Sequence, residues 1–107
     1  MPTISDSVTT VAGVTTANVL SGNPFEFLTR PRNVVSLYVS SAAATTTAIF
    51  QIGGRTIFQG GLVPGTNRFP LRQEDGVVQS RGVAGERMFL TFNDPAAVAV
   101  RFLIDIA

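Results

Sequence analysis

Two acidic turns contain side chains that could take part in catalysis, and in one of them two carboxylates are adjacent. Glu74 and Asp75 are adjacent and directly precede a glycine, and Asp94 lies between an asparagine and a proline. Paired carboxylates can relay protons or hold a metal ion when they share a pocket. Acidic residues beside Gly and Pro are more typical of solvated turns, where Asn and Asp hydrogen-bond the local backbone. Neither turn offers the alternating oxygen ligands of a calcium loop, so we expect no metal site at either.

The sequence lacks the residue types on which most enzymatic mechanisms depend. Its 107 residues include no cysteine and no histidine, and all eight basic residues are arginines. These absences exclude a cysteine nucleophile, a histidine base, a Schiff-base lysine, a disulfide framework and a cysteine–histidine zinc site. Serine and threonine are frequent, but no histidine or lysine can activate them, and a Gly-x-Ser-x-Gly motif is absent. We therefore predict a protein that is not an enzyme and uses no cofactor.

The arginines could still bind anionic groups through their guanidinium side chains. Arg30 and Arg32 flank Pro31, and guanidinium groups in such a position could contact phosphate or an acidic partner surface. No basic cluster lies near this pair in the sequence, so we prefer the interpretation that they form structural ion pairs. The net charge of +1 argues against a specific nucleic-acid-binding protein, which normally carries a basic patch.

The low overall charge indicates that partners cover part of the surface. Only 14% of the residues are charged, whereas soluble domains contain about 25%. A small isolated domain needs more charged surface for solubility. No apolar run approaches the roughly 18 residues of a membrane helix, and no secretory signal is visible. We therefore expect protein partners, and neither a membrane span nor a small-molecule substrate.

Apolar residues that alternate with a period of two predict β-strands through most of the chain. The clearest run is 97–106, where five alternations without a slip fix the register. A Gly53-Gly54 pair between two β-prone runs predicts a hairpin, because primed turns need positive φ. No segment has convincing helical periodicity. The expected strands are 24–29, 34–40, 46–52, 55–59, 67–71, 77–81, 87–92 and 97–106.

This pattern predicts an all-β fold. Seven to eight short strands separated by close turns are typical of an antiparallel β-sandwich, here jelly-roll-like and spanning residues 23–107. Residues 1–22 carry one charge, Asp6, and no aromatic residue. They predict an extended N-terminal arm with a strand around residues 8–14. Such an arm is ordered only when it pairs with a neighbouring sheet or subunit, and a disordered tail is the alternative.

Apolar positions outside the expected core indicate where partners bind. The outer faces of the last two strands carry an aromatic and a leucine, whereas a sheet facing only water is normally more polar there. Ordinary apolar surface is the alternative, since soluble proteins expose much of it. Valines of the arm complete the candidate surface. The predicted interface residues are Val8, Val11, Val14, Phe89, Arg101 and Leu103.

Four features of the sequence occur together in one known class of protein. They are the threonine-rich arm up to Gly22, the following Asn23-Pro24-Phe25-Glu26-Phe27 run, the absence of lysine and the stop after the last strand at Ile106-Ala107. In these features the chain resembles small virion proteins of bacterial viruses: capsid, vertex or decoration subunits with a β-sandwich or jelly-roll core. The resemblance implies a structural protein of the virion, assembled in the host cytoplasm, that binds copies of itself and other virion proteins. We expect truncation to Gly22 to abolish assembly while leaving a folded core.

A ligand-binding β module, for a glycan or a receptor and as part of a spike, is the alternative function. Loops 60–65 and 73–85 would form its site. Sugar-binding surfaces usually expose aromatic side chains, but this chain has no tryptophan, a single tyrosine and eight phenylalanines expected mostly at inward or turn-adjacent positions. The mass of the native assembly distinguishes the two functions, because a stable monomer contradicts a shell subunit.

Overall fold

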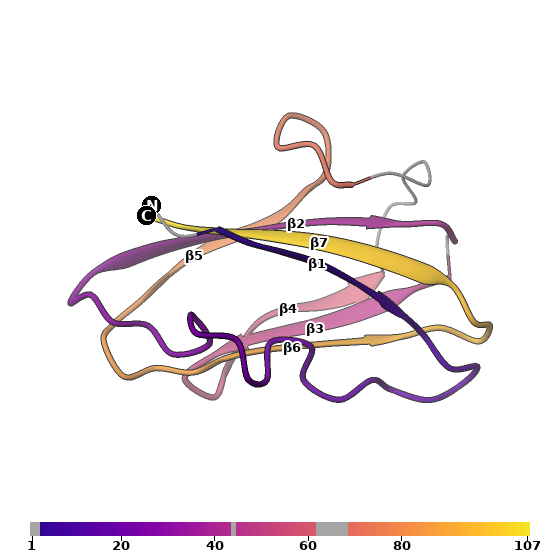
Figure 1. The fold of residues 1–107 in the computed structure, drawn as a ribbon, viewed down its shortest axis with the longest axis horizontal. Coiled ribbons are helices and arrows are strands. Elements are labelled where there is room, and N and C mark those ends of the chain that lie inside the picture. Colours follow the sequence, from indigo (N-terminus) through magenta and orange to yellow (C-terminus); the bar gives the residue numbers. More distant parts are fainter. Residues whose placement is uncertain (1–2, 44, 62–68) are drawn as a thin grey trace.

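The computed structural model describes residues 3–43, 45–61 and 69–107, and within them seven strands form two antiparallel sheets (Figure 1). The sheets pack face to face, so the predicted all-β sandwich is confirmed. No helix occurs in these ranges, and none there could therefore span a membrane. The strands are β1 (Thr3–Thr9), β2 (Asn33–Ser41), β3 (Thr47–Ile52), β4 (Arg55–Gly61), β5 (Gly76–Gly82), β6 (Met88–Asn93) and β7 (Ala99–Ile106).

The order of the strands is jelly-roll-like. The larger sheet has the order β1-β7-β2-β5 and the smaller one β4-β3-β6. Apart from the β3–β4 hairpin, every connection after β2 crosses from one sheet to the other, as in the double-sheet jelly rolls. An irregular segment, residues 10–28, lies beside β6 where a fourth strand would be. Its Thr16 and Val19 amides donate to the carbonyls of Phe92 and Leu90, at 2.8 and 3.0 Å. We call residues 10–28 the linking segment.

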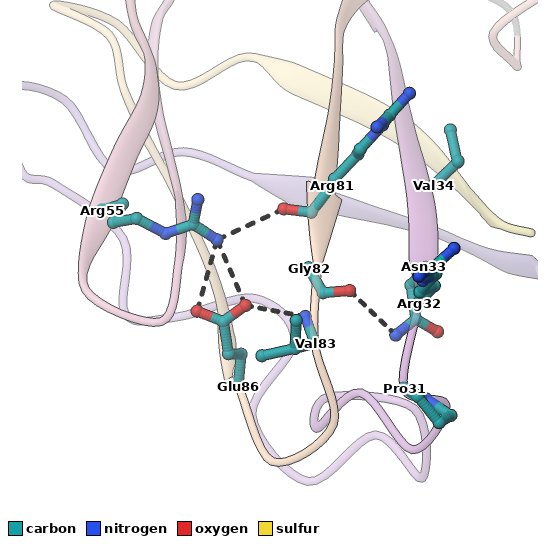
Figure 2. A pocket seen from close by; sticks show the side chains of 9 residues that line it. All are labelled: Pro31, Arg32, Asn33, Val34, Arg55, Arg81, Gly82, Val83 and Glu86. Carbon is teal, nitrogen blue, oxygen red and sulfur yellow. Dashed lines mark hydrogen bonds and ion pairs between the residues drawn. The ribbon is translucent and has the colours of Figure 1, made fainter.

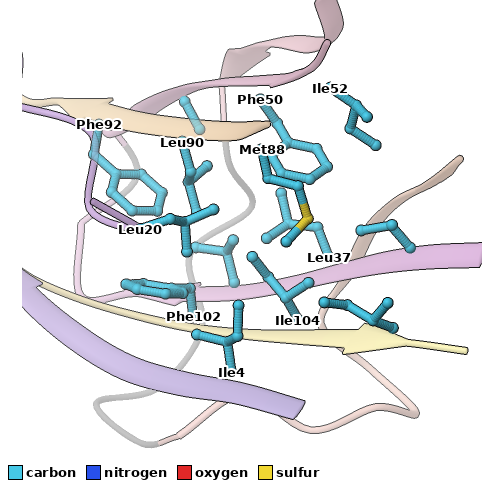
Figure 3. Packing of buried hydrophobic residues seen from close by; sticks show 14 of the residues in the cluster. Ile4, Leu20, Leu37, Phe50, Ile52, Met88, Leu90, Phe92, Phe102 and Ile104 are labelled. Carbon is cyan, nitrogen blue, oxygen red and sulfur yellow. The ribbon is translucent and has the colours of Figure 1, made fainter. Parts of the chain in front are cut away.

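Alternating side chains from both sheets form the core between them (Figure 3). The inward faces of β2, β3, β6 and β7 are buried as the period-two pattern predicted. Phe50, Phe92 and Phe102 are fully buried, and the last two rings meet with centroids 6.0 Å apart. Burial of a side chain of this size stabilises the fold by about 1.5–3 kcal/mol. Side chains of a single chain form this core. The two packed sheets hold the loops in place at both ends of the sandwich.

The β3–β4 hairpin forms at the predicted glycine pair. Gly53 and Gly54 both have positive φ, 60° and 81°, as a primed two-residue turn requires. A β-bulge between Phe50 and Gln51 shifts the register, so that Phe58 pairs with Phe50. This bulge explains how two consecutive apolar residues of β4, Ile57 and Phe58, can both pack against the core.

The N-terminal residues pack on the sheets of their own chain. β1 pairs with β7 along its whole length, and Ile4 and Leu20 are buried in the common core. The strand predicted around residues 8–14 is wrong in position, because Gly13 adopts a φ of 70° in a turn and β1 ends at Thr9. The neighbouring sheet that orders this region is therefore internal. Truncation to Gly22 would remove core side chains, so the expectation that it leaves a folded core loses its physical basis.

The phenylalanine-rich run at 24–29 is not a strand, contrary to its alternation. A single bridge joins Phe27 to Arg87, and Glu26 and Leu28 are the buried pair, whereas Phe25 and Phe27 are 42% and 53% exposed. The expectation that these aromatics fill the core is wrong. Glu26 takes the inward position because its charge is paired there. Of the predicted strand 67–71, residues 67 and 68 lie outside the described ranges, and 69–71 are not a strand.

Candidate functional site

Five of the eight arginines stand in or beside three loops. These loops lie at the same end of the sandwich, at the left of Figure 1. Three loops build this end: the last part of the linking segment with residues 29–32, the β3–β4 hairpin and the β5–β6 connection. We call it the arginine end. Its arginines are Arg30, Arg32, Arg55, Arg81 and Arg87.

Two of these arginines hold the end together. Arg55 Nη2 donates to both carboxylate oxygens of Glu86, at 3.1 and 3.3 Å, and to the Arg81 carbonyl at 3.2 Å. Arg87 Nε donates to the buried carboxylate of Glu26. Glu26 also accepts from the Gly22 amide at 3.1 Å, which closes the turn before the exposed phenylalanines. These pairs make the hairpin, the β5–β6 connection and the linking segment one unit.

The other three arginines have no such role. Arg30, Arg32 and Arg81 are exposed, and none forms an ion pair within the described part of the chain. The preferred interpretation of Arg30 and Arg32 as structural ion pairs is therefore wrong for this part of the chain. The basic cluster that is absent along the sequence exists in space, because the fold brings Arg32 and Arg81, which are 49 positions apart, to the same end.

A cleft of about 670 Å³ opens at this end between the start of β2, β4 and the end of β5 (Figure 2). Gly82 allows the linking segment to pack closely against the end of β5, because a Cβ at this position would lie 2.3 Å from Leu28 Cδ1. Arginine side chains and apolar side chains together surround the opening. We call it the arginine cleft, and its lining residues are Pro31, Arg32, Asn33, Val34, Arg55, Arg81, Gly82, Val83 and Glu86.

Charge is unevenly distributed along the molecule. Residues 24–32, 53–55 and 81–87 contain five arginines and two glutamates, a net charge of +3. The rest of the sequence contains three arginines and five acidic residues, a net charge of −2. The overall value of +1 thus conceals a basic end, which favours contact with anionic groups.

Exposed apolar side chains accompany the arginines. Phe25, Phe27 and Val83 are 42%, 53% and 55% exposed. The Arg87 guanidinium carbon lies 5.9 Å from the centroid of the Phe27 ring, within the range of a cation–π contact. Arginine and aromatic residues together are the composition that protein interfaces favour.

At the opposite end of the sandwich, at the right of Figure 1, a buried carboxylate is hydrogen-bonded within the chain. Asp94 is fully buried and accepts from the hydroxyls of Thr46 and Thr45 at 2.7 and 2.9 Å and from the Ala96 amide at 2.8 Å. These bonds, that of Thr46 first, hold the pKa of Asp94 below its usual range. The Thr10 hydroxyl links the linking segment to the Ala96 carbonyl at 2.9 Å. We call this the threonine end.

A loop of the chain itself partly covers the outer face of the larger sheet. Arg72 donates two hydrogen bonds to Asp105, at 2.6 and 2.9 Å, and with the Thr3 hydroxyl this holds the pKa of that carboxyl below its usual range. The Phe69 ring centroid lies 5.3 Å from the guanidinium carbon of Arg101. The apolar outer face that indicated a partner is thus partly covered from within the chain.

The six predicted interface residues do not form one surface. Val11 and Val14 pair in a bridge at the threonine end and are 63% and 54% exposed, whereas Val8 packs against the core. Two others, Arg101 and Leu103, lie on the outer face of β7, half-buried, and Phe89 lies half-buried on β6 of the other sheet.

The structure gives the acidic turn at Asp75 a structural role and places part of one predicted ligand loop at the arginine cleft. The Asp75 carboxylate accepts from the Leu71 amide at 2.7 Å, as a turn-stabilising residue does. No group of three or more acidic side chains that could hold a metal ion exists in the described ranges. Of the predicted ligand loops, residues 81–83 of loop 73–85 line the arginine cleft, whereas most of loop 60–65 lies outside the described residues.

Sequence reasoning singled out two arginines of this end and missed Arg55, Arg81 and Arg87. The available signal was that each of these three stands at or beside a predicted turn, where strand ends meet. Turn positions alone do not reveal which loops share an end. No protein-family model, curated protein or solved structure matches the chain, so the geometry of this end stands as the basis for function.

Proposed function

We propose that the protein is a non-enzymatic structural subunit that self-assembles into, or coats, a larger shell such as a viral capsid. One observation carries the proposal: two phenylalanines and a valine stay exposed around the arginine end although the core of the sandwich is complete. Removing such side chains from water is favourable at about 25 cal/mol per Å². Contact with another copy provides that burial, and the arginines around it give the contact its orientation.

The distribution of apolar surface supports association along the long axis of the molecule. Val11 and Val14 stay exposed at the threonine end, so both ends of the sandwich carry apolar side chains. A contact between unlike ends of successive copies is heterologous and builds rings or open arrays.

Sedimentation velocity of the full chain and of two matched double variants tests this function. Phe25→Ser with Phe27→Ser removes exposed apolar side chains from the arginine end, and Val11→Ser with Val14→Ser removes them from the threonine end. We expect the wild-type chain to sediment as an assembly and the first variant to sediment as a folded monomer. If unlike ends of successive copies meet, the second variant should also associate more weakly than the wild-type chain. A wild-type chain that stays monomeric at high concentration contradicts self-assembly.

A ligand-binding module is the second candidate, because the arginine cleft is lined in part by residues of a loop predicted for that purpose. A monomeric chain that nevertheless binds anionic glycans on an array would favour this function over the first.

A further inference from the structure

The arginine cleft presents cations that the described part of the chain leaves without ionic partners. Arg32 lines it from the position directly before β2, Arg81 lines it from β5, and both side chains are exposed. Arg55, the third arginine, is engaged by Glu86. Three arginines and one glutamate give the lining a net charge of +2.

The walls of the cleft are held in place by hydrogen bonds. The buried Asn33 side chain donates to the Arg30 carbonyl at 2.8 Å and to the Gly82 carbonyl at 3.2 Å, which ties the start of β2 to the end of β5. The Val83 amide donates to Glu86 Oε1 at 2.8 Å. Figure 2 shows the bond from Asn33 to Gly82 and the bond from Val83 to Glu86. A cleft fixed in this way costs little ordering entropy when a ligand enters.

Among the described residues, no carboxylate forms an ion pair with Arg32 or Arg81. Glu26, Glu86 and Asp105 pair with other arginines, and Asp94 is buried in its threonine network. An anion that pairs with Arg32 and Arg81 would therefore come from another molecule. A carboxylate accepts two parallel hydrogen bonds from a guanidinium group, which makes arginine and carboxylate a well-matched pair.

The apolar part of the lining identifies the kind of molecule. Pro31, Val34 and Val83 lie among the arginines, and Phe25 and Phe27 stand exposed on the neighbouring loop. A peptide offers both carboxylates and apolar side chains at the spacing of single residues. A nucleic acid offers a row of phosphates, which the net charge of −2 on the rest of the molecule disfavours.

We infer that the arginine cleft binds an acidic peptide segment of a partner protein, with its carboxylates paired to Arg32 and Arg81 and its apolar side chains against Val34 and Val83. The volume of about 670 Å³ suits such a segment, since ligand sites measure about 300–1,000 Å³. This site goes beyond self-assembly, because it needs neither a second copy nor contact between the two ends.

Fluorescence anisotropy with labelled hexaglutamate tests the inference on the full chain. The double variant Arg32→Gln with Arg81→Gln should bind hexaglutamate about tenfold more weakly or worse, because two charge-assisted contacts are lost. The matched control is Arg101→Gln with Arg72→Gln, which removes the same charge from the outer face of the larger sheet. Circular dichroism of each variant verifies that it is folded.

A further variant tests the inference in the opposite direction, because it should strengthen the binding of hexaglutamate. Glu86→Gln removes the carboxylate that competes for Arg55 while keeping an oxygen for the Val83 amide. We expect it to bind hexaglutamate roughly threefold more tightly, because an additional guanidinium group becomes available.

Three results would overturn the inference. One is an equal loss of binding in the cleft variant and the outer-face control, which would indicate a nonspecific charge effect. Another is no binding of hexaglutamate by the wild-type chain. The third is binding of a six-nucleotide thymidine oligomer in preference to hexaglutamate, which would assign the cleft to nucleic acid. Sedimentation of the same variants reports on self-assembly separately, so failure of this site and failure of the proposed function are distinguishable.

Discussion

The two ends of the sandwich differ in whether their charged groups all have partners within the chain: a buried carboxylate is hydrogen-bonded at one end, and three exposed arginines form no ion pair among the described residues at the other. At the threonine end, the Asp94 carboxylate is buried, and Thr45, Thr46 and the Ala96 amide all donate to it. At the arginine end, Arg30, Arg32 and Arg81 are exposed and form no ion pair within the described residues. Both ends are loops closing the same two sheets, so the difference lies in their side chains and not in the architecture.

This difference separates polar groups that stabilise the fold from those available to a partner. A buried carboxylate left without donors would cost several kcal/mol, so the chain must satisfy Asp94 itself. An exposed guanidinium group is hydrated and costs the fold little when it lacks a partner. The arginine end can therefore keep cations for another molecule without a large loss of stability.

The largest expected effect concerns the linking segment, which runs between the two ends. Leu20 is fully buried on it, so Leu20→Ala should lower the free energy of unfolding by about 3 kcal/mol. Urea denaturation measures this value, with Leu71→Ala as the control, since Leu71 is 46% exposed. Equal effects of the two substitutions would mean that the linking segment is not part of the core.

A smaller effect is expected from Asp94, and it depends on pH. Because the folded-state pKa is depressed, the unfolded state binds the proton more readily. The stabilisation is therefore complete above about pH 5, begins to decrease as the pH nears the ordinary Asp pKa of about 4, and is lost as the pH falls further through the depressed folded-state pKa. Asp94→Asn should lower Tm by roughly 5 °C at pH 7 and flatten this acid dependence. Thermal melts from pH 7 to pH 3 measure both.

Asp6→Asn serves as the control for that series, because the Asp6 carboxylate is exposed and its hydrogen bond is to the adjacent Ser7 amide. An Asp94→Asn variant as acid-sensitive as the wild-type chain would show that the threonine network does not depend on the charge of Asp94.

The smallest effect is expected for the cations of the cleft. Arg32→Gln and Arg81→Gln should each change the free energy of unfolding by less than about 0.5 kcal/mol, since neither forms an ion pair in the described residues. Arg87→Gln should cost more, about 2 kcal/mol, because it leaves the buried Glu26 carboxylate without its cation. Similar costs for Arg32 and Arg87 in urea denaturation would contradict the contrast between structural and available arginines.

The inward faces of the central strands could be predicted because alternation along a strand assigns its faces directly. Val100, Phe102 and Ile104 follow this rule without exception, and Gly53-Gly54 marks its turn for an equally local reason. The rule failed where a long-range partner decided the outcome. Glu26 is inward and Phe27 outward because Arg87, 61 positions away, pairs with the carboxylate.

The candidate site was less predictable than the fold, because it consists of loops from distant parts of the chain. Arg32 was recognised as a possible anion contact, but the other two arginines of the cleft, Arg55 and Arg81, come from β4 and β5. The valines around residues 8–14 have high β propensity, yet Gly13 turns the chain there. Their propensity indicated a strand, and only the turn geometry and the pairing with β7 placed it at Thr3–Thr9.

The sequence by itself determined the available chemistry and the layered fold: guanidinium groups without histidine, cysteine or lysine, and apolar residues with a period of two. Only the tertiary structure decided which arginines stabilise the protein and which stay available. The pairs Arg55–Glu86 and Arg87–Glu26 join residues 31 and 61 positions apart. Ion pairing depends on distance in space, and that distance exists only once the two sheets have packed.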